Sequence, residues 1–465
     1  MLPARSNRLL MWACLYACSL WPYVASAQPS AAGEDAAAPV EIDSGRSDGA
    51  AQDTSNPLPA ELTPQQTAEY FELLKLFADT LDQVERNYVE QVSRRELLEA
   101  AIQGVLAKLD EYSDYIPPDQ FDNFRTGVEN EFGGIGIKVG IMDGQLTVIT
   151  PLYDTPAYRT GVLAGDRILM IGDQSTEGLK LEDAIGFMKG PIGSDIKLRV
   201  KHPDDVEEQV TLKRELVRME TVLGVFRRAD DRWEYMLDDE QQVGYIRISS
   251  FSGHTAEDLK RALRDLTERE VKMLVLDLRF NPGGLLSSAV EVADCFLSDG
   301  LIVSTEGRNT PRREWKATEP GTFDRVELVV LINQYSASAS EIVAACLQDH
   351  QRAVIIGERS WGKGSVQNII ELEGGRSALK LTTAGYKRPS GKNIHRFEGA
   401  TEDDDWGVQA NAGHELRLSL DETRRLLAFH RDLDVIRTPT QKKEPRPETY
   451  IDPQLKAALD YAVKQ

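Results

Sequence analysis

The chain has 465 residues, a formal net charge of −21 and a hydrophobic fraction of 41%. Domains usually run to about 100–200 residues, so this length predicts two or three folded units and excludes a single compact core. The negative charge is spread along the chain and would repel phosphates, which argues against nucleic acid as a partner.

Residues 1–27 have the pattern of a signal peptide. Arg5 and Arg8 give a positive start, Leu9 to Leu20 form an apolar stretch, and Val24 to Ala27 offer small residues for cleavage. The apolar stretch is shorter than the roughly 20 residues that span a bilayer. We therefore expect an exported protein, periplasmic in a two-membrane bacterium and secreted otherwise. A lipid anchor at Cys18 is the minority interpretation, because a bulky tyrosine stands two residues before it.

Two different segments follow the signal. Residues 28–62 are rich in Ala, Ser, Asp, Gly and Pro with almost no large apolar side chains, which predicts a flexible leader. In residues 63–130 apolar positions recur at spacings of three and four, which predicts helices of a packing or oligomer-forming kind. These positions are Tyr70, Leu73, Leu74, Phe77, Leu81 and Val84, and then Leu97, Leu98, Ile102, Val105 and Leu106.

Residues 131–217 have short β-like runs punctuated by glycine. At the start of this insert a glycine loop runs into a strand, and its N–H groups could hold a terminal carboxylate while the strand edge pairs with an extended peptide. Taken alone, a glycine-rich strand start is weak evidence. The candidate peptide-binding residues are Gly134, Ile135, Gly136 and Ile137, with Leu181, Ile185 and Met188 on a helix-like segment opposite.

Residues 218–436 alternate apolar strands with helical stretches, which predicts an α/β core. Residues 437–465 begin with a charged, proline-rich segment that predicts a linker. Asp452 and Pro453 then provide a cap and an early proline, and apolar residues follow at helical spacing, so we expect a final docking helix. The candidate strands of the core are Val271–Leu278, Val326–Ile332, Ala353–Ile356 and Val366–Leu372.

Ser338 stands where a predicted strand meets a predicted helix. A hydroxyl there would lie at the end of the strand, and the first helical N–H groups, including that of Ala339, would point towards a developing negative charge. That arrangement suits acyl transfer. On this segment alone a helix cap is the commoner explanation, because Ser338 and Glu341 also match a capping box.

Two motifs near Lys363 are misleading. The run from Gly357 to Lys363 matches the G-x-x-x-x-G-K phosphate loop, but Gly364 stands where Ser or Thr is needed and a β-like run follows where a helix is needed. The run from Ser360 to Lys363 matches S-x-x-K, but the glycine inside it argues against the helix that motif needs. A nucleophile-elbow spelling at Gly45–Gly49 lies in the leader, with no strand or helix predicted around it. None of the three predicts function.

Lys363 itself is the candidate base, because it lies between two glycines where a strand is predicted to start. Gln367 would share its face in an extended chain, since side-chain direction alternates with period two. A desolvated lysine would fall from its reference pKa of about 10.4 towards neutrality and could take a proton from serine. Most lone lysines are solvated surface residues. The six histidines stand in no triad-like or zinc-binding pattern, so no metal site is predicted.

A third element is the run Asn281-Pro-Gly-Gly, which follows the predicted strand Val271–Leu278. Adjacent glycines let the backbone approach a ligand closely, so Gly283 or Gly284 could form half of an oxyanion hole with the amide of Ala339. Without context the same run is an ordinary turn.

Cys295 and Cys346 both lie in apolar contexts, which predicts two buried thiols. An oxidising compartment would permit a disulfide between them, and the sequence leaves that alternative open.

In this order the segments resemble the C-terminal processing peptidases, also called tail-specific proteases, over roughly residues 65–465. The resemblance rests on Ser336–Glu341 with the strand before it, on Gly362–Gln367 and on Asn281–Gly284. Two departures, Tyr335 and Trp361, affect the surroundings of the site and remove no reacting group. The insert is similar to a PDZ domain, most clearly at Thr155–Gly161 and Ala164–Leu169.

The resemblance implies an α/β fold: a crotonase-like β/α protease core with an inserted PDZ domain and flanking helices. It assigns Ser338 as nucleophile, Lys363 as general base and Gln367 as the residue that orients the lysine, with no metal or other cofactor. The expected partners are protein substrates with apolar C-terminal tails, which the PDZ domain recognises. Helical ends in this family often build homo-oligomers, and some members use adaptor proteins. The alternative is an inactive PDZ scaffold that binds protein C-termini without cutting them.

Overall fold

The computed structural model describes residues 63–319, 321–437 and 450–462. The predicted signal peptide, the leader and nearly all of the predicted linker lie outside these residues. The described chain divides into two compact units: residues 123–366 with 383–462 form the larger, and residues 63–122 with 367–382 form the smaller. Within the described ranges, none of the helices combines the length and apolar character needed to cross a membrane.

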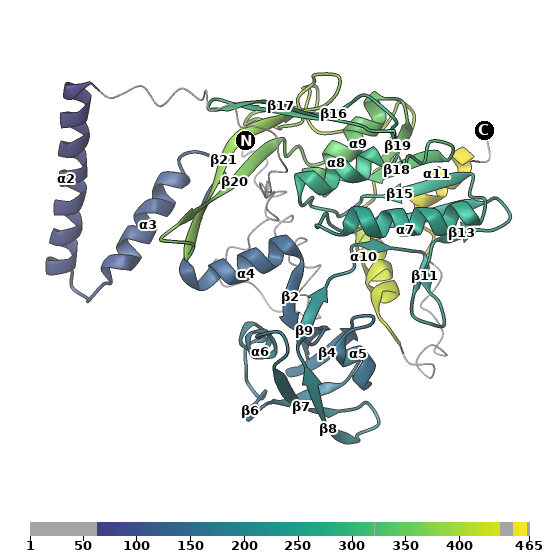
Figure 1. The fold of residues 1–465 in the computed structure, drawn as a ribbon, viewed down its shortest axis with the longest axis horizontal. Coiled ribbons are helices and arrows are strands. Elements are labelled where there is room, and N and C mark those ends of the chain that lie inside the picture. The colour runs from purple at the N-terminus through teal and green to yellow at the C-terminus, as the bar shows by residue number, and fades with distance from the viewer. Residues whose placement is uncertain (1–62, 320, 438–449, 463–465) are drawn as a thin grey trace. The chain divides into compact units, whose positions relative to one another are not determined.

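The centre of the larger unit is a sheet in which β14, β15, β18 and β19 run parallel in that order, with β10 and β13 antiparallel to β14. Parallel neighbours need long crossover connections, which contain α7, α8 and α9 (Figure 1). The predicted α/β core is confirmed, and three of its predicted strands appear in this sheet as β15, β18 and β19. The fourth, Val366–Leu372, is a strand but pairs with β21 in a different sheet. The bounds are β10 (Val222–Leu223), β13 (Met236–Asp238), β14 (Val243–Ile248), α7 (Thr255–Glu268), β15 (Met273–Asp277), α8 (Leu286–Asp294), β18 (Glu327–Ile332), α9 (Ala339–Asp349) and β19 (Ala353–Gly357).

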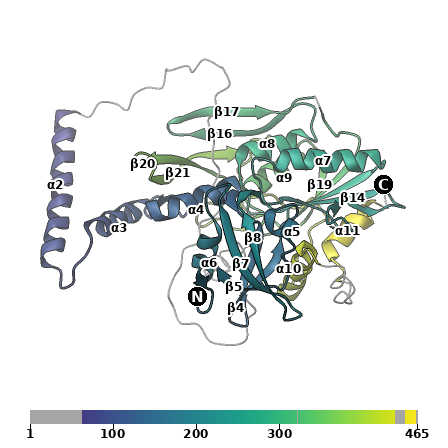
Figure 2. The ribbon, with the colours of Figure 1, turned by 60° about the horizontal axis from the view of Figure 1, so that its bottom comes forward.

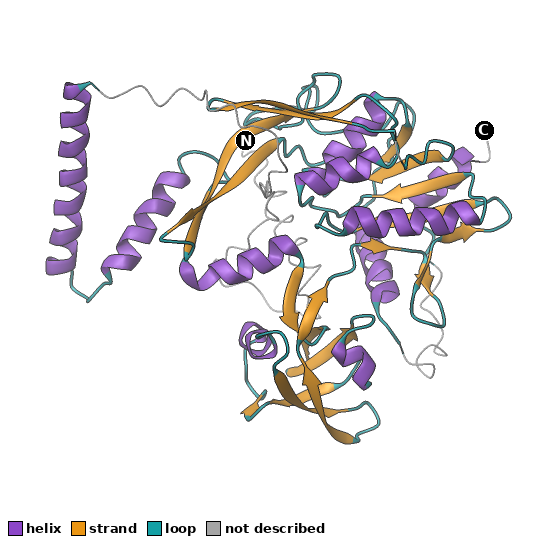
Figure 3. Cartoon of the chain, in the orientation of Figure 1, coloured by secondary structure: helices purple, strands orange, loops and turns teal. Residues whose placement is uncertain are grey.

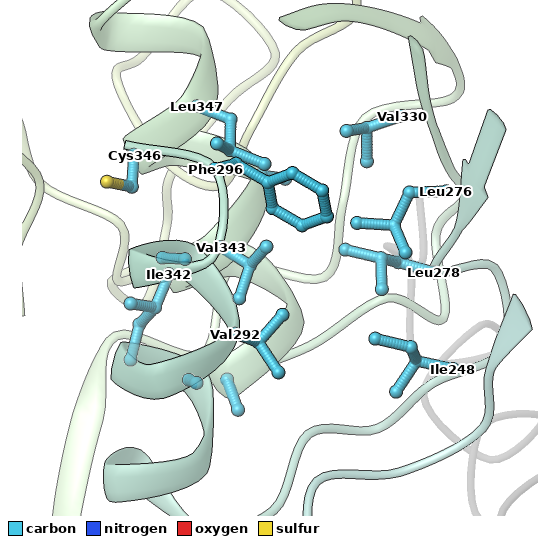
Figure 4. Close-up of a cluster of buried hydrophobic side chains, with 14 of the residues drawn as sticks. Ile248, Leu276, Leu278, Val292, Phe296, Val330, Ile342, Val343, Cys346 and Leu347 are labelled. Carbon is cyan, nitrogen blue, oxygen red and sulfur yellow. The ribbon is translucent and has the colours of Figure 1, made fainter. Parts of the chain in front are cut away.

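Each face of this sheet is buried, because successive strand residues point to opposite sides. On one face Leu276 and Val330 pack with residues of α8 and α9, and the Phe296 ring lies among them (Figure 4). On the other face Val275 and Val329 pack against the final helix, α11 (Pro453–Ala462). The predicted docking helix is therefore confirmed.

Further elements of the larger unit surround this sheet. A hairpin of β16 and β17 pairs with the C-terminal end of β21 (Figure 2). A small hairpin of β11 and β12 precedes β13. Helix α10 comes before the undescribed residues 438–449. The bounds are β11 (Phe226–Arg227), β12 (Trp233–Glu234), β16 (Leu301–Gly307), β17 (Thr310–Lys316), β20 (Ser365–Leu372), β21 (Ser377–Lys387) and α10 (Leu420–Asp434).

Residues 131–218 begin and end with the antiparallel pair β2 and β9. Between them lies a sheet of order β3-β4-β5-β7-β8, with β6 on β5 and the helices α5 and α6 (Figure 3). Its core is separate from that of the central sheet of the larger unit and includes Val148, Leu198 and Val200. The bounds are β2 (Glu131–Gly134), β3 (Ile137–Met142), β4 (Gln145–Pro151), α5 (Pro156–Thr160), β5 (Arg167–Ile171), β6 (Gln174–Ser175), α6 (Leu181–Met188), β7 (Asp195–Lys201), β8 (Glu207–Lys213) and β9 (Glu215–Arg218).

The smaller unit holds α2 and α3, and α4 continues from it into the larger unit along the chain. Strand β1 pairs antiparallel with Ala378–Lys380 of β21. Arg95 on α3 forms an ion pair of 2.9 Å with Glu373. The helices predicted between residues 63 and 130 are confirmed. The bounds are α2 (Pro64–Asn87), α3 (Arg94–Leu106), β1 (Asp114–Ile116) and α4 (Pro118–Glu129).

Candidate active site

Ser338 occupies the turn between the parallel strand β18 and helix α9, as the sequence predicts. It is the N-cap of α9, only 1% exposed, with φ 57° and ψ −114°. Such a conformation is strained for a residue with a side chain and persists only where its surroundings enforce it. The same sharp strand-to-helix turn presents the serine in nucleophile elbows.

A buried carboxylate holds this turn. Glu341, on the first turn of α9, is fully buried, and its Oε2 accepts the backbone N–H of Ser338 at 2.8 Å. The same oxygen accepts the backbone N–H of Lys363, also at 2.8 Å. Its Oε1 accepts the N–H of Gly362 at 2.7 Å and the hydroxyl of Ser360 at 2.5 Å. Burial raises the pKa of Glu341, and these hydrogen bonds offset part of the rise.

This carboxylate brings the two candidate reacting residues together. Because one oxygen binds both N–H groups, the backbone nitrogens of Ser338 and Lys363 lie no further apart than twice 2.8 Å. Lys363 is 4% exposed, so it is not the solvated surface lysine that its sequence context alone would allow. Strand β20 begins at Ser365, which places Lys363 in the loop before the strand.

The loop after β15 lies directly against Ser338. Gly283 has φ +108°, and an added Cβ there would lie 2.8 Å from Ser338 Cβ and 3.0 Å from Ala339 N. At Gly284, with φ +146°, an added Cβ would lie 2.0 Å from Phe251 O. Both positions therefore require glycine, one for the approach to the serine and one for the approach to the backbone of Phe251.

The N–H groups at this loop differ in availability. The N–H of Gly283 donates to Asn281 Oδ1 at 2.8 Å. Within the described ranges, the N–H groups of Gly284 and Ala339 have no acceptor. These two are the better-placed candidates for an oxyanion hole, since a donor already engaged has to break its bond first.

Asparagine and serine side chains fix the loop and the turn to each other. Asn281 O accepts the N–H of Ala337 and the hydroxyl of Ser340, each at 3.0 Å. Asn333 Oδ1 accepts the N–H of Phe280 at 3.0 Å. These hydrogen bonds connect the glycine loop to the turn at Ser338.

Gln367 lies on β20, in the smaller unit, and is 1% exposed. Its Nε2 donates to Thr382 Oγ1 at 3.2 Å, and Thr382 Oγ1 donates to Asp110 Oδ1 at 3.2 Å. These contacts fix the amide within its own unit. The predicted role of Gln367 towards Lys363 stays a prediction.

The predicted peptide-binding residues lie at the end of β2 (Gly134), on the loop 135–136, on β3 and on α6, and α6 lies against β3. Ile135 is buried, and Gly136 has φ +77° with its backbone against Thr155, whose hydroxyl donates to Gly136 O at 3.0 Å. Among the described residues, no acceptor lies at the N–H of Ile135 or Gly136. The side chains of Ile137, Leu181 and Ile185 are half-buried, whereas Met188 is buried in the domain core.

Sequence reasoning missed the full role of Glu341. The capping-box pattern predicted its bond to the Ser338 N–H, but its bonds to Gly362 and Lys363 join segments more than 20 residues apart. Both predicted buried thiols, Cys295 and Cys346, are free and buried, and burial raises the pKa of each to about 12. The described residues contain no cluster of side chains suited to a metal ion.

Comparisons with known proteins agree with this geometry. The model of Peptidase family S41 matches residues 242–405, a PDZ domain model matches residues 148–202, and the model "Activating protease CtpB N-terminal domain" matches residues 44–119. A carboxy-terminal-processing protease of Bartonella bacilliformis is 39% identical over 339 residues, which cover 72% of this chain and 75% of that protein.

Further relatives carry the same description. A carboxyl-terminal-processing protease of Synechocystis is 36% identical over 67% of this chain and 71% of its own length, and CtpB of Bacillus subtilis is 33% identical over 72% and 68%. A solved photosystem II D1 C-terminal processing protease aligns with 75% of this chain and 93% of its own at 26% identity, with a TM-score of 0.40.

The family models and the relatives show that this chain, with its serine turn, buried lysine and PDZ domain, is a serine-type endopeptidase. It belongs to the family of carboxy-terminal processing proteases.

Proposed function

We propose that this endopeptidase cuts proteins selected by their apolar C-terminal tails, with Ser338 as nucleophile and Lys363 as general base. The observation that carries the proposal is the single oxygen of Glu341 that accepts the backbone N–H of both residues. Taken separately, Ser338 could be an ordinary helix cap and Lys363 an ordinary surface lysine. Instead, Glu341 holds the two residues together in a buried site.

The reaction follows from the chemistry of these groups. Ser338 Oγ attacks the carbonyl carbon of the scissile peptide while the amine of Lys363, in its neutral form, takes its proton. The N–H groups of Ala339 and Gly284, with Gly283 as the alternative, hold the oxyanion. The proton then passes to the leaving amine and the acyl-enzyme forms. Lys363 next takes a proton from water, which attacks the ester carbonyl, and passes that proton to Ser338 Oγ as the ester C–O bond breaks and the acid product leaves. Gln367 orients the lysine in this scheme.

Tail recognition belongs to the PDZ domain, which we place at residues 131–217. PDZ domains bind an extended peptide as an added strand and hold its terminal carboxylate on backbone N–H groups. The end of β2 at Gly134, the loop 135–136 and strand β3 from Ile137 supply those elements, and Leu181 and Ile185 on α6 offer half-buried apolar surface to the last side chains of a tail. The buried Met188 supports that surface from beneath.

The remaining domain assignments follow the same reasoning. We propose a crotonase-like core at residues 218–436, supported by the parallel strands with helical crossovers, and a linker with a C-terminal helix at residues 437–465. The N-terminal pattern supports export from the cytoplasm.

The test compares Ser338→Ala and Lys363→Ala with wild type on a loosely folded protein that ends in an apolar tail. Each substitution removes a group that changes protonation or bonding in the reaction, so each should reduce cleavage by at least about 10³-fold. Lys316→Ala, at a lysine 68% exposed on β17, is the matched control and should cleave normally. Undiminished cleavage by either variant removes the assignment. Tail binding without any product fragments from wild type would favour the scaffold alternative.

A further inference from the structure

A fully buried arginine stands immediately before the glycine loop. Arg279 lies two residues before Asn281, and its side chain has no exposed surface. Its Nε and Nη2 bind the carboxylate of Asp277, at the end of β15, at distances of 2.6–3.1 Å. That carboxylate also accepts the hydroxyl of Tyr245 at 2.8 Å.

The other side of this guanidinium is bound by the C-terminal segment. Asp452 accepts from Nη1 at 3.0 Å and from Nη2 at 2.6 Å, and Gln454 Oε1 accepts from Nη1 at 2.9 Å. These residues stand 173 and 175 positions after Arg279, at the start of α11. Burial acts to lower the pKa of Arg279, but the two carboxylates raise it well above its ordinary value, so the group stays charged.

Gln454 also reaches the segment that leads to Lys363. Its Nε2 donates to Leu416 O at 2.7 Å, and the N–H of Leu416 donates to Gly357 O at 2.9 Å. Gly357 ends strand β19, six residues before Lys363. The amide of Gln454 thus binds both Arg279, which precedes the glycine loop, and Leu416, which is bonded to the end of the strand that precedes the Lys363 loop.

The backbone beside Arg279 needs such support. Phe280 has φ +60°, which is unfavourable for a bulky residue, and Asn281 follows with its bonds to the nucleophile turn. A strained turn keeps its conformation only while the residues around it hold it. The C-terminal segment supplies three of the hydrogen bonds that hold the arginine next to this turn.

We propose that Asp452 and Gln454 are positioning residues for hydrolysis: through Arg279 they set the place of the glycine loop that faces Ser338. Neither touches the reacting groups. The inference rests on the proposed roles of Ser338 and of the glycine loop, and it extends the machinery of the protease to a segment at the far end of the chain.

The experiment uses the full chain with Asp452→Asn and Gln454→Ala. A matched control is Asp349→Asn, which disturbs a similarly buried ion pair with Arg388 (2.6 Å) at the other end of α9. Each protein is assayed at several temperatures below its own unfolding transition, and kcat and KM are measured on one peptide with an apolar tail. Ser338→Ala is included to establish that the cleavage depends on the serine.

Displacement of oxyanion donors by a fraction of an ångström to 1 Å reduces rate by up to about 10²-fold. We expect kcat of Asp452→Asn to fall by about 10- to 100-fold and that of Gln454→Ala by about 3- to 10-fold, with KM within about twofold. Asp349→Asn should lose thermal stability and keep its kcat.

The inference is overturned if both variants keep the wild-type kcat while folded, or if Asp349→Asn loses as much kcat as Asp452→Asn. Should Asp452→Asn fail to fold, Gln454→Ala decides alone, because it removes no charge. A Ser338→Ala protein that still cleaves would refute the proposed function, which is a separate result.

Discussion

The proposed catalytic loops of the core and the proposed peptide-binding surface of the PDZ domain are built in opposite ways. At the catalytic loops the key polar groups are buried, and one carboxylate, Glu341, has four hydrogen-bond donors. At the PDZ surface the apolar side chains of Leu181 and Ile185 are half-buried. Among the described residues, the backbone N–H groups of Ile135 and Gly136 have no acceptor. Chemistry requires fixed distances, whereas tail binding requires an accessible edge. Substitutions in the first region should therefore change kcat and stability together, and those in the second should change KM.

We expect the largest effect from Glu341→Gln. Each carboxylate oxygen accepts two of the four hydrogen bonds, so an NH₂ group in place of either oxygen removes two of them. We expect kcat to fall by at least about 100-fold and the free energy of unfolding to fall by roughly 2–4 kcal/mol. Chemical denaturation and single-turnover cleavage measure the two effects.

Glu327→Gln, at an exposed glutamate at the start of β18, is the matched control and should behave as wild type. If Glu341→Gln loses stability but cleaves normally when folded, the carboxylate holds the fold and does not set the distance between Ser338 and Lys363.

Gly283→Ala tests the approach of the glycine loop to Ser338. The added Cβ would lie 2.8 Å from Ser338 Cβ, and φ +108° is unfavourable for alanine. The turn must shift, so we expect kcat to fall by about 10- to 100-fold and stability to fall by about 1–3 kcal/mol. Gly253→Ala is the control, because an added Cβ there would contact nothing within 4 Å. Normal kcat in Gly283→Ala would show that the serine tolerates a displaced loop.

The surroundings of Glu341 and Gly283 also show which parts of the site the local sequence encodes. Local patterns predicted the strand before Ser338, the turn, the helix after it and the glycine loop, because each is encoded by neighbouring residues. The same patterns favour a helix-cap role for Ser338. The hydrogen bonds that pair it with Lys363 run through a carboxylate shared between distant segments, and local patterns do not encode them. The contacts of Arg279 with Asp452 span 173 residues, and no periodicity or motif encodes such a pairing.

The PDZ side of the comparison is tested by Ile185→Ser. This substitution removes apolar surface from α6 at a half-buried side chain that packs against the domain core. Binding of an apolar tail should therefore weaken, with some loss of stability of the domain, while the proposed catalytic loops stay intact. We expect KM for a tailed peptide to rise by about 10-fold with little change in kcat, which corresponds to roughly 1.4 kcal/mol of lost binding. A peptide of the same cleavage sequence with a charged tail should show a much smaller difference between the two proteins.

Phe187→Ser is the matched control, because Phe187 lies on the same helix and is 45% exposed. An equal rise in KM for both variants would place the tail elsewhere on the domain, and a fall in kcat for Ile185→Ser alone would mean that the two regions are coupled.

The smallest expected effect concerns a titratable pair in the PDZ domain. His202 Nδ1 lies 2.8 Å from Asp166 Oδ1, and Asp166 is fully buried. Burial acts to lower the pKa of His202, but Asp166 and Glu208 raise it above its ordinary value of 6.5. A raised pKa in the folded state means that the stabilisation is complete below pH 6.5 and is lost as pH rises through the folded value. Hydrogen exchange of β7 and β8 in the full chain should therefore be slower, after correction for intrinsic rates, at pH 5.5–6 than at about pH 8. His202→Gln should remove this difference, and His414→Gln should keep it. Protection that does not change with pH in wild type would contradict the pairing. A change confined to the PDZ strands would show that the PDZ domain has a stability separate from that of the rest of the chain.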